Sequence, residues 1–333
     1  MNHRMLVFCA ALGLNLCGAN ADGGELPVFN DSFEEKTLSV VCPAPLTGPV
    51  FNRYQISALP NVTIDTEEWR MAKRPVTSSS ELLTTGHQAE FYADAVGEYQ
   101  LTYRAMAKEE YSACSTIMDA DTEDALVVEL AWTGESADLD LFLHRAPVDT
   151  FLYWDEVTTE NVDLCYWRTC KTCIASYTVP DYEQQCRTAL EDADPNPVLV
   201  WNPTENAANP RLDLDDIEGH GPEVINVRAP DPGTYRVAAH LWDLDGDIAT
   251  SAQVRVLCIG DVIYTSQAVT LEEHGLTTDP TANDVWEVGD LVITEEAGRY
   301  NCSFQQFGND ECHRICSLDD ANSSGCPIAA CEL

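Results

Sequence analysis

Residues 138–144 read DLDLFLH, and this stretch decides the fold class. Charged and apolar residues alternate in it, so a β strand would carry its leucines on one face and its two aspartates on the other. Short runs of this kind recur along the chain between Gly, Pro, Asn and Asp residues, and we find no long helical periodicity. The sequence therefore predicts an all-β protein with two β-sandwich domains in tandem. Its core should include Leu139, Leu141 and Leu143, with Val127, Leu130, Leu214, Tyr235 and Val237 beside them.

A second acidic stretch, DLDD, follows at residues 213–216, and Glu223 stands shortly after it. Carboxylates gathered without a cation repel one another, and calcium takes six to eight oxygen ligands from such groups. The two stretches predict either a calcium site or a solvated acidic strand face. The candidate metal ligands are Asp138, Asp140, Asp213, Asp215, Asp216 and Glu223. Residues 243–247, DLDGD, resemble the start of an EF-hand loop, but Val254 replaces the required Glu, which favours a hairpin turn there.

The overall charge is strongly negative, with 18 Lys and Arg against 56 Asp and Glu and a net charge of −38. Such a surface repels nucleic acid and anionic membranes and attracts cations. A hydrophobic fraction of 45% and seven tryptophans exclude a disordered acidic tail. Beyond residue 21 no apolar run approaches the roughly 20 residues that span a bilayer. We therefore expect a folded protein without a nucleic-acid partner or a transmembrane segment.

The first 21 residues have the features of a secretory signal peptide. Arg4 precedes an apolar run at 5–16, and residues 19–21 form an Ala-x-Ala cleavage site. Lipoprotein anchoring at Cys17 is the alternative, but Leu16 is not the small residue that normally precedes a lipidated cysteine. We predict a protein that is secreted or held at the cell surface, periplasmic or extracellular, with a flexible lead-in at residues 22–37.

Fourteen cysteines, of which the signal removes two, leave twelve for disulfides in an oxidising compartment. The C-x-x-C at 170–173 lacks a second pair at zinc-ribbon spacing and lies in a loop-like context, so structural disulfides are favoured there over zinc or redox chemistry. We expect one pair to bracket each sandwich, Cys42 with Cys114 and Cys258 with Cys302. The others should pair within the insertion, Cys165, Cys170, Cys173 and Cys186, and within the tail, Cys312, Cys316, Cys326 and Cys331.

The first domain, residues 38–119, resembles a known module. The stretches EEWRMAKRPVTSSS (67–80) and AEFYADAVGEYQLTYRA (89–105) are similar to the polycystic kidney disease (PKD) type of immunoglobulin-like domain, although the usual Asp-Gly-rich start is missing. The residues that match are Trp69, Arg74, Pro75, Phe91, Asp94, Gly97 and Tyr99. The resemblance implies a spacing or adhesion role without catalysis.

The second domain, residues 124–304, resembles the β-sandwiches of bacterial secreted proteins, similar to bacterial pre-peptidase C-terminal domains. The order of motifs carries this resemblance, through Trp132, Asp138, Asp140, Asp213, Asp215, Asp216, Gly221, Pro222, Glu223, Gly233 and Tyr235. A disulfide-rich insertion at 147–209 and a Cys-rich tail at 305–333 complete the predicted architecture, since short segments need disulfides in place of a core.

Function is predicted as non-enzymatic, because no nucleophile, zinc-protease or phosphate-loop motif occurs. We expect a secreted binding, adhesion or envelope structural protein that recognises an extracellular protein or carbohydrate surface. The insertion tryptophans Trp154, Trp167 and Trp201 could form such a surface or pack beneath the disulfides. The alternatives are a carboxylate-based hydrolase that uses the 138/140 and 213–223 acids, and an accessory module that targets a partner enzyme.

Overall fold

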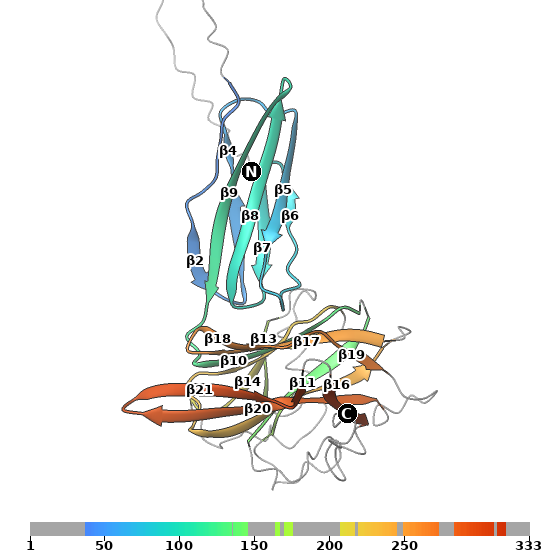
Figure 1. Ribbon diagram of the computed structural model, residues 1–333. Coiled ribbons are helices and arrows are strands. Elements are labelled where there is room, and N and C mark those ends of the chain that lie inside the picture. Colours follow the sequence, from blue (N-terminus) through green and yellow to red (C-terminus); the bar gives the residue numbers. More distant parts are fainter. Residues whose placement is uncertain are drawn as a thin grey trace, which may run out of the picture. The chain divides into compact units, whose positions relative to one another are not determined.

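The computed structural model describes residues 37–134, 136–145, 164–166, 170–175, 207–216, 219–244, 249–272, 283–309 and 312–317. Within these ranges the named elements are all β strands, as the alternating pattern predicts (Figure 1). The signal peptide, the lead-in before residue 37 and the insertion tryptophans lie outside the described residues. So do Cys186, Cys326 and Cys331 and the side chains of Cys173 and Cys312.

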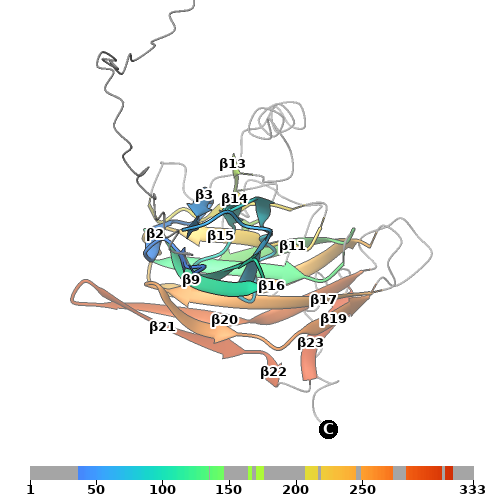
Figure 2. The ribbon, with the colours of Figure 1, turned by 90° about the horizontal axis from the view of Figure 1, so that it is seen from above.

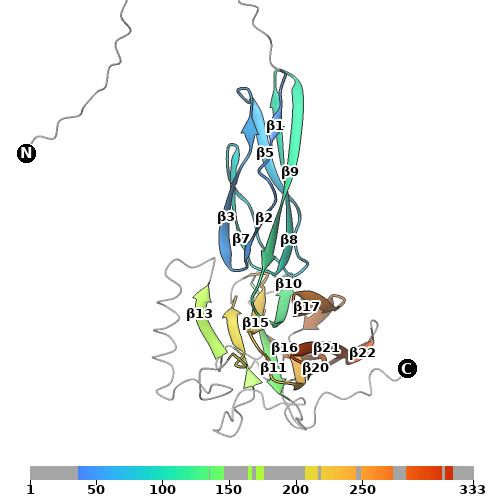
Figure 3. The same cartoon turned by 90° about the vertical axis from the view of Figure 1, so that its left-hand side faces the viewer.

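The first sandwich consists of two facing sheets and a short strand pair. One sheet has the order β2 (Leu46–Pro49), β9 (Glu110–Asp121), β8 (Gly97–Ala107) and β5 (Thr66–Lys73). The other has the order β3 (Asn52–Ser57), β7 (Gln88–Ala93) and β6 (Leu83–Thr85), while β1 (Val40–Val41) pairs with β4 (Leu59–Pro60). Figure 3 shows β3 and β7 in one layer and β8 and β9 in the other. Tyr99, Leu101 and Tyr103 alternate along β8 and are fully buried between the layers.

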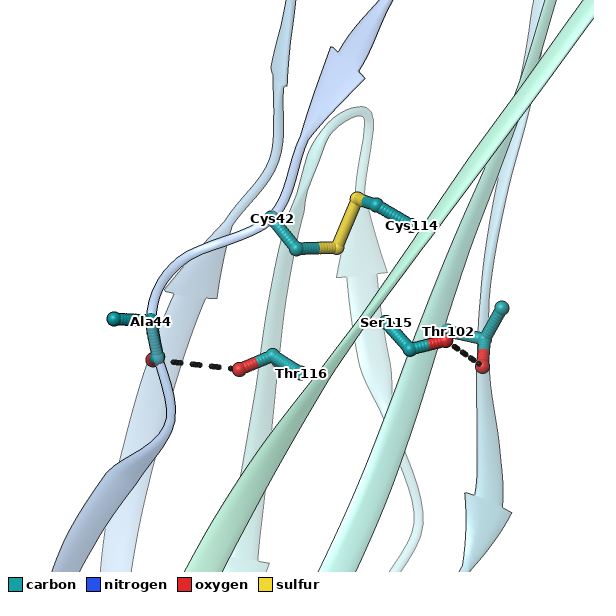
Figure 4. The surroundings of a disulfide bond; sticks show 6 residues. All are labelled: Cys42, Ala44, Thr102, Cys114, Ser115 and Thr116. Atoms are coloured by element: carbon teal, nitrogen blue, oxygen red, sulfur yellow. Dashed lines mark hydrogen bonds between the residues drawn. A yellow bond between two sulfur atoms is a disulfide. The ribbon is translucent and has the colours of Figure 1, made fainter.

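A disulfide joins Cys42, which follows β1, to Cys114 in β9, and this is the pair that the sequence predicts (Figure 4). The Cα atoms of the two cysteines lie 5.5 Å apart. Near the disulfide the Thr116 hydroxyl donates to the Ala44 carbonyl at 3.4 Å, and the hydroxyls of Thr102 and Ser115 lie 3.0 Å apart. The disulfide and the Thr116 hydrogen bond hold the start of the domain against β9, and the Thr102–Ser115 pair joins β9 to β8.

The second sandwich has a first sheet in the order β13 (Lys171–Ala175), β14 (Arg211–Leu214), β15 (Glu223–Val227), β10 (Leu126–Trp132), β17 (Ala249–Cys258) and β18 (Asp261–Thr265), with β19 (Val269–Glu272) also on β17. Its second sheet has the order β12 (Leu164–Cys165), β11 (Asp138–Arg145), β16 (Gly233–Asp243), β20 (Asp284–Glu296), β23 (Cys312–Ser317) and β22 (Gly308–Asn309), with β21 (Arg299–Gln306) on β20 (Figure 2). The predicted alternation in β11 is confirmed, since all three leucines of residues 138–144 are fully buried in the core between these sheets.

Strand β10 is buried on both faces, and this corrects one expectation. Leu130 packs in the core of the second sandwich together with Tyr235 and Val237, as predicted. Val127 and Leu214 are also buried, but they pack against the core of the first sandwich instead. The sheet therefore has a second apolar face, because the first sandwich covers it.

Among the described residues, two disulfides with both cysteines placed fasten the second sandwich. Cys258 at the end of β17 bonds Cys302 in β21, with 6.3 Å between their Cα atoms. This is the pair that the sequence predicts, and because the two strands belong to different sheets, the bond connects the layers. Cys165 bonds Cys170, with 5.2 Å between their Cα atoms. The first cysteine of the C-x-x-C sequence is therefore part of a structural disulfide.

A buried polar network connects the two sandwiches, which belong to one compact unit from Thr37 onward. Glu129 of β10 is fully buried and accepts hydrogen bonds from the Thr77 hydroxyl and the Val96 amide, the latter at 3.0 Å. Arg255 of β17 donates to the same carboxylate at 2.7 Å and to the Val96 carbonyl. Because a buried charge is tolerable only when paired and hydrogen-bonded, this network fixes the contact between the sandwiches.

Asp94 holds the two loops of the first sandwich that reach this network. Its carboxylate accepts hydrogen bonds from the hydroxyls of Ser78, Ser79 and Tyr99, at 2.5, 3.0 and 2.9 Å. The Ser79 amide donates to it as well, at 2.8 Å. Burial raises the pKa of Asp94, and these donors oppose the rise. Hydrogen bonds to Asp94 thus join the turn at residues 74–79 to the segment at residues 93–99.

Candidate functional site

The acidic stretches of the sequence meet at one edge of the second sandwich. Asp138 and Asp140 lie in β11, and Asp215 and Asp216 follow the last residue of β14. Glu223 is the first residue of β15. Side chains from both sheets therefore contribute to this acidic cluster, since β11 belongs to the second sheet and β14 and β15 to the first.

Glu223 occupies the open edge of β11. The amide of Leu141 donates to Oε2 of Glu223 at 2.5 Å, while Leu141 pairs with Ala239 of β16 on its other side. The next strand, β12, pairs only with Leu143 and His144, so it begins just beyond this point. The carboxylate of Glu223 thus takes the place of a strand partner and carries a β15 side chain across to the other sheet.

Oε1, the other carboxylate oxygen of Glu223, accepts no backbone hydrogen bond of this kind among the described residues. The residue is 1% exposed, and Oε1 has no hydrogen-bond partner within the described part of the chain. Burial raises the pKa of Glu223 well above its usual range, and the neighbouring Asp215 and Asp140 raise it further. The carboxyl of Asp215 beside it can donate to it only while one of the two groups carries a proton. Oε1 is therefore a buried acceptor that faces another acid.

Asp138 is the second acid of the cluster whose pKa is strongly raised. Burial raises its pKa to about 9, with contributions from Asp140, Asp215, Asp216 and Asp243. Asp243 lies directly opposite Asp138 in the β11–β16 ladder, and the register is irregular beside this pair. Like charges that face each other across two strands destabilise the pair, so the site favours either a bound proton or a cation.

The turn from β14 to β15 needs glycine at two positions to bring its acids into the cluster. Gly221 has φ +75°, and a Cβ there would lie 2.8 Å from the ring of Trp132. Gly219 has φ +152°, and a Cβ there would lie 3.1 Å from a carboxylate oxygen of Asp216. Any larger side chain would displace Trp132 or the acid, so the glycines allow the turn to fold against β10.

Asp213 has a different environment from the other predicted ligands. Its carboxylate accepts hydrogen bonds from Asn226 at 2.8 Å and from Arg211 at 3.2 Å. Arg211 also bonds Asp124 at 2.9 Å, so Asp213 belongs to a paired ionic group. Conversely, Asp243 was not among the predicted ligands, although the DLDGD stretch at 243–247 was a visible signal of acids at a strand end.

Asp140 lies near the imidazole of His240 on the neighbouring strand, with 3.7 Å between Nδ1 and the carboxylate. In the described residues no group of three His, Cys, Asp or Glu side chains has its donor atoms placed to hold a metal ion as they stand. Two cavities, of about 440 and 640 Å³, are lined by residues other than these acids. Chemically, the cluster can hold protons or, after side-chain rotation, a hard cation.

Comparison with known proteins shows no family. No protein-family model matches the chain, and no curated protein matches its sequence. The PKD and pre-peptidase C-terminal resemblances therefore stay predictions. The fold and the site together define a disulfide-bonded, all-β protein with an acidic cluster in its second sandwich.

Among solved structures the chain is similar to titin Ig tandem domains, at 10% identity over 66% of this chain and 94% of that one, with a TM-score of 0.18. It is also similar to titin domains in complex with telethonin, at 10% identity over 67% and 98%, with a TM-score of 0.20. A quinonprotein alcohol dehydrogenase-like protein from Bacteroides thetaiotaomicron matches at 8% identity over 79% and 70%, with a TM-score of 0.18. Scores this low carry no argument about function.

Among the described residues no helix is long and apolar enough to cross a membrane. Disulfides in both sandwiches fit an oxidising environment.

Proposed function

We propose that this protein is an exported, non-enzymatic binding or structural module whose second sandwich is stabilised by calcium. The observation that supports the calcium part is Glu223, a fully buried carboxylate that lies beside further acids and whose Oε1 accepts no hydrogen bond from a basic, hydroxyl or amide group of the described residues. Calcium prefers oxygen ligands and accepts irregular geometry, which suits carboxylates supplied by several strands. The proposed ligands come from both sheets: Asp138, Asp140, Asp215, Asp216, Asp243 and Glu223.

Calcium would act here as a connector between the layers. Binding requires the carboxylates to rotate until their oxygens lie about 2.3–2.6 Å from the ion. The cation would replace the protons that the raised pKa values of Asp138 and Glu223 imply. Asp213 stays outside the proposed ligand set, because Arg211 and Asn226 already hold its carboxylate.

The hydrolase alternative receives less support from this geometry. A glycosidase-type site needs two carboxylates beside a cleft that admits a sugar ring. Glu223 and Asp140 are buried, and neither of the two described cavities is lined by an acid of the cluster. The binding and structural role is therefore the function that we propose.

Thermal melts of the metal-free protein, with and without calcium, test this proposal. We expect calcium in about hundredfold excess over its Kd to add about 2.7 kcal/mol and to raise Tm by about 5–10 °C. Magnesium should do less, because it demands octahedral geometry and dehydrates reluctantly. A melt that neither chelator nor calcium changes would contradict the calcium site.

One variant separates a metal site from a solvated acidic face. Asp138→Asn replaces a carboxyl that its raised pKa keeps protonated without metal by a neutral amide of similar size, so the metal-free variant should melt at least as high as the unmodified protein while losing its response to calcium. Asp261→Asn, which changes an exposed acid of β18, is the matched control and should keep the full calcium response. Equal calcium responses in the two variants would remove Asp138 from the site.

A further inference from the structure

The first sandwich has an open lateral edge with a groove along it. Strand β5 pairs with β8 only, so its other side has no strand partner in the described part of the chain. A cavity of about 640 Å³ follows this side and is lined by residues 69–74 and 80–82. Five consecutive residues of β5, 69–73, can line one groove only if it runs along the edge, since each face of the strand shows alternate residues. The groove therefore faces the backbone amides and carbonyls of β5.

The walls of the groove contain polar atoms without partners. Nε1 of Trp69 and Oγ of Ser80 are buried and make no hydrogen bond to the described residues. Both residues are only 5% exposed, and they come from opposite walls, β5 and the segment before β6. Buried polar groups are normally satisfied, so these two atoms are available to a ligand in the groove only after a small movement of its walls.

The groove also carries the densest run of cations in the sequence, beside one acid, Glu81. Residues 70–74 read RMAKR, with three of the 18 Lys and Arg of the chain, and no other five-residue stretch holds more than two. Arg70 and Lys73 are 56% and 61% exposed and form surface ion pairs with Glu68 at 2.7 Å and Glu98 at 3.1 Å. Exposed pairs of this kind are weak, so a ligand carboxylate can replace either partner acid. Arg74 donates to the Ser80 carbonyl and fixes the width between the walls.

Apolar side chains supply the remaining surface. Met71 and Leu82 line the groove and are partly buried against the core of the first sandwich. The cations at 70 and 73 and the apolar contacts at 71 and 82 suit a ligand strand that alternates acidic and apolar residues.

From these features we infer that the β5 edge binds an extended acidic segment of a partner protein, which adds to the sheet as a further strand. Main-chain hydrogen bonds to an unpaired edge give such complexes their affinity, and side-chain pockets give them specificity. A ligand strand of five or six residues at about 3.3 Å each matches the length of the β5 wall from 69 to 73. The inference gives the proposed binding role a site and a partner chemistry, and it rests on that role but not on the calcium site in the other sandwich.

The test uses the full chain and a capped hexapeptide of alternating Glu and Val, with binding followed by isothermal titration calorimetry at low salt. We expect saturable binding that weakens about fivefold to tenfold in the double variant R70Q/K73Q. The matched control R53Q/R228Q also removes two surface cations paired with acids, at 3.3 and 2.6 Å, and should bind as the unmodified protein does. The same peptide with alternate amide nitrogens methylated should not bind, because it cannot pair with an edge strand.

Three outcomes would overturn the inference. The first is an acidic peptide that does not bind, and the second is equal binding by R70Q/K73Q and the unmodified chain. The third is self-association of the chain that R70Q/K73Q abolishes, since the occupant would then be a second copy. Each variant is checked by a calcium-dependent melt, so that failure of peptide binding is separable from failure of the calcium proposal.

Discussion

At the scale of single residues, the cluster at the edge of the second sandwich is defined by the cost of burying charge. Asp138 faces Asp243 across the β11–β16 ladder, and Glu223 lies beside Asp215, with no donor for its Oε1 among the basic, hydroxyl and amide groups that the structure describes. Contrast Glu129, which is equally buried but accepts hydrogen bonds from Thr77, Val96 and Arg255. The environments of Asp138 and Glu223 favour bound protons or a cation. The carboxylate of Glu129 already has hydrogen-bond donors and a positively charged partner.

Asp138 gives a pH prediction whose sign follows from its raised pKa of about 9. Between an unfolded pKa near 3.9 and that value the folded state binds more protons than the unfolded state, so stability must fall as pH rises. We expect the metal-free protein to lose free energy of unfolding between pH 5 and pH 8, by up to about 1.4 kcal/mol per pH unit for one proton.

Urea unfolding at the two pH values measures this effect. Calcium needs the ionised carboxylates, so a saturating concentration should flatten the pH dependence, and Asp138→Asn should flatten it without metal. Equal stability of the metal-free protein at pH 5 and pH 8 would show that Asp138 titrates in its ordinary range.

At the scale of elements, β10 differs from a strand of a half-solvated sheet. Its sequence LVVELAW lacks strict alternation because both faces are covered, one by the core of its own sandwich and the other by the first sandwich. Val127 and Val128 point to opposite faces yet are 1% and 0% exposed.

Because both faces of β10 are buried, we expect a hydroxyl introduced on either face to lower the free energy of unfolding by a similar amount. Val127→Thr and Val128→Thr should each lower the free energy of unfolding by about 1–3 kcal/mol, since the new hydroxyl has to leave water. Val262→Thr in β18, where the valine is 52% exposed, is the control and should stay within about 0.5 kcal/mol. Denaturant midpoints measure all three, and a neutral Val127→Thr would mean that the first sandwich does not cover this face.

At the scale of the whole molecule, the Glu129–Arg255 network couples the sandwiches. The two groups are 0% and 7% exposed, and their hydrogen bonds reach loops that Asp94 holds in the first sandwich. A mutation at this contact should therefore affect how the domains unfold together as well as their total stability.

We expect calorimetry of the unmodified chain to show a single unfolding transition, and Glu129→Ala to split it into two. The variant leaves Arg255 buried without its acid, which costs about 3–5 kcal/mol. Glu90→Gln removes an exposed acid that pairs with Arg53 and should leave one transition with nearly unchanged Tm. Two transitions in the unmodified chain would contradict the coupling.

Local sequence was sufficient for the features that depend only on strand geometry. The period of two in DLDLFLH predicts both the strand and its three buried leucines, because side chains of a strand alternate whatever its partners are. The pairing of Cys42 with Cys114 follows from strands placed early and late in one domain.

Tertiary structure decided the features that depend on register and on contacts between distant segments. Asp243 faces Asp138 because the register of β11 and β16 shifts between Asp138 and Leu139, whereas Asp213 pairs with Arg211 and Asn226. The second buried face of β10 and the open edge of β5 likewise depend on which strands lie beside them. Periodicity is a property of neighbours along the chain, but the burial of a charge and the absence of a strand partner are set by residues far away in sequence.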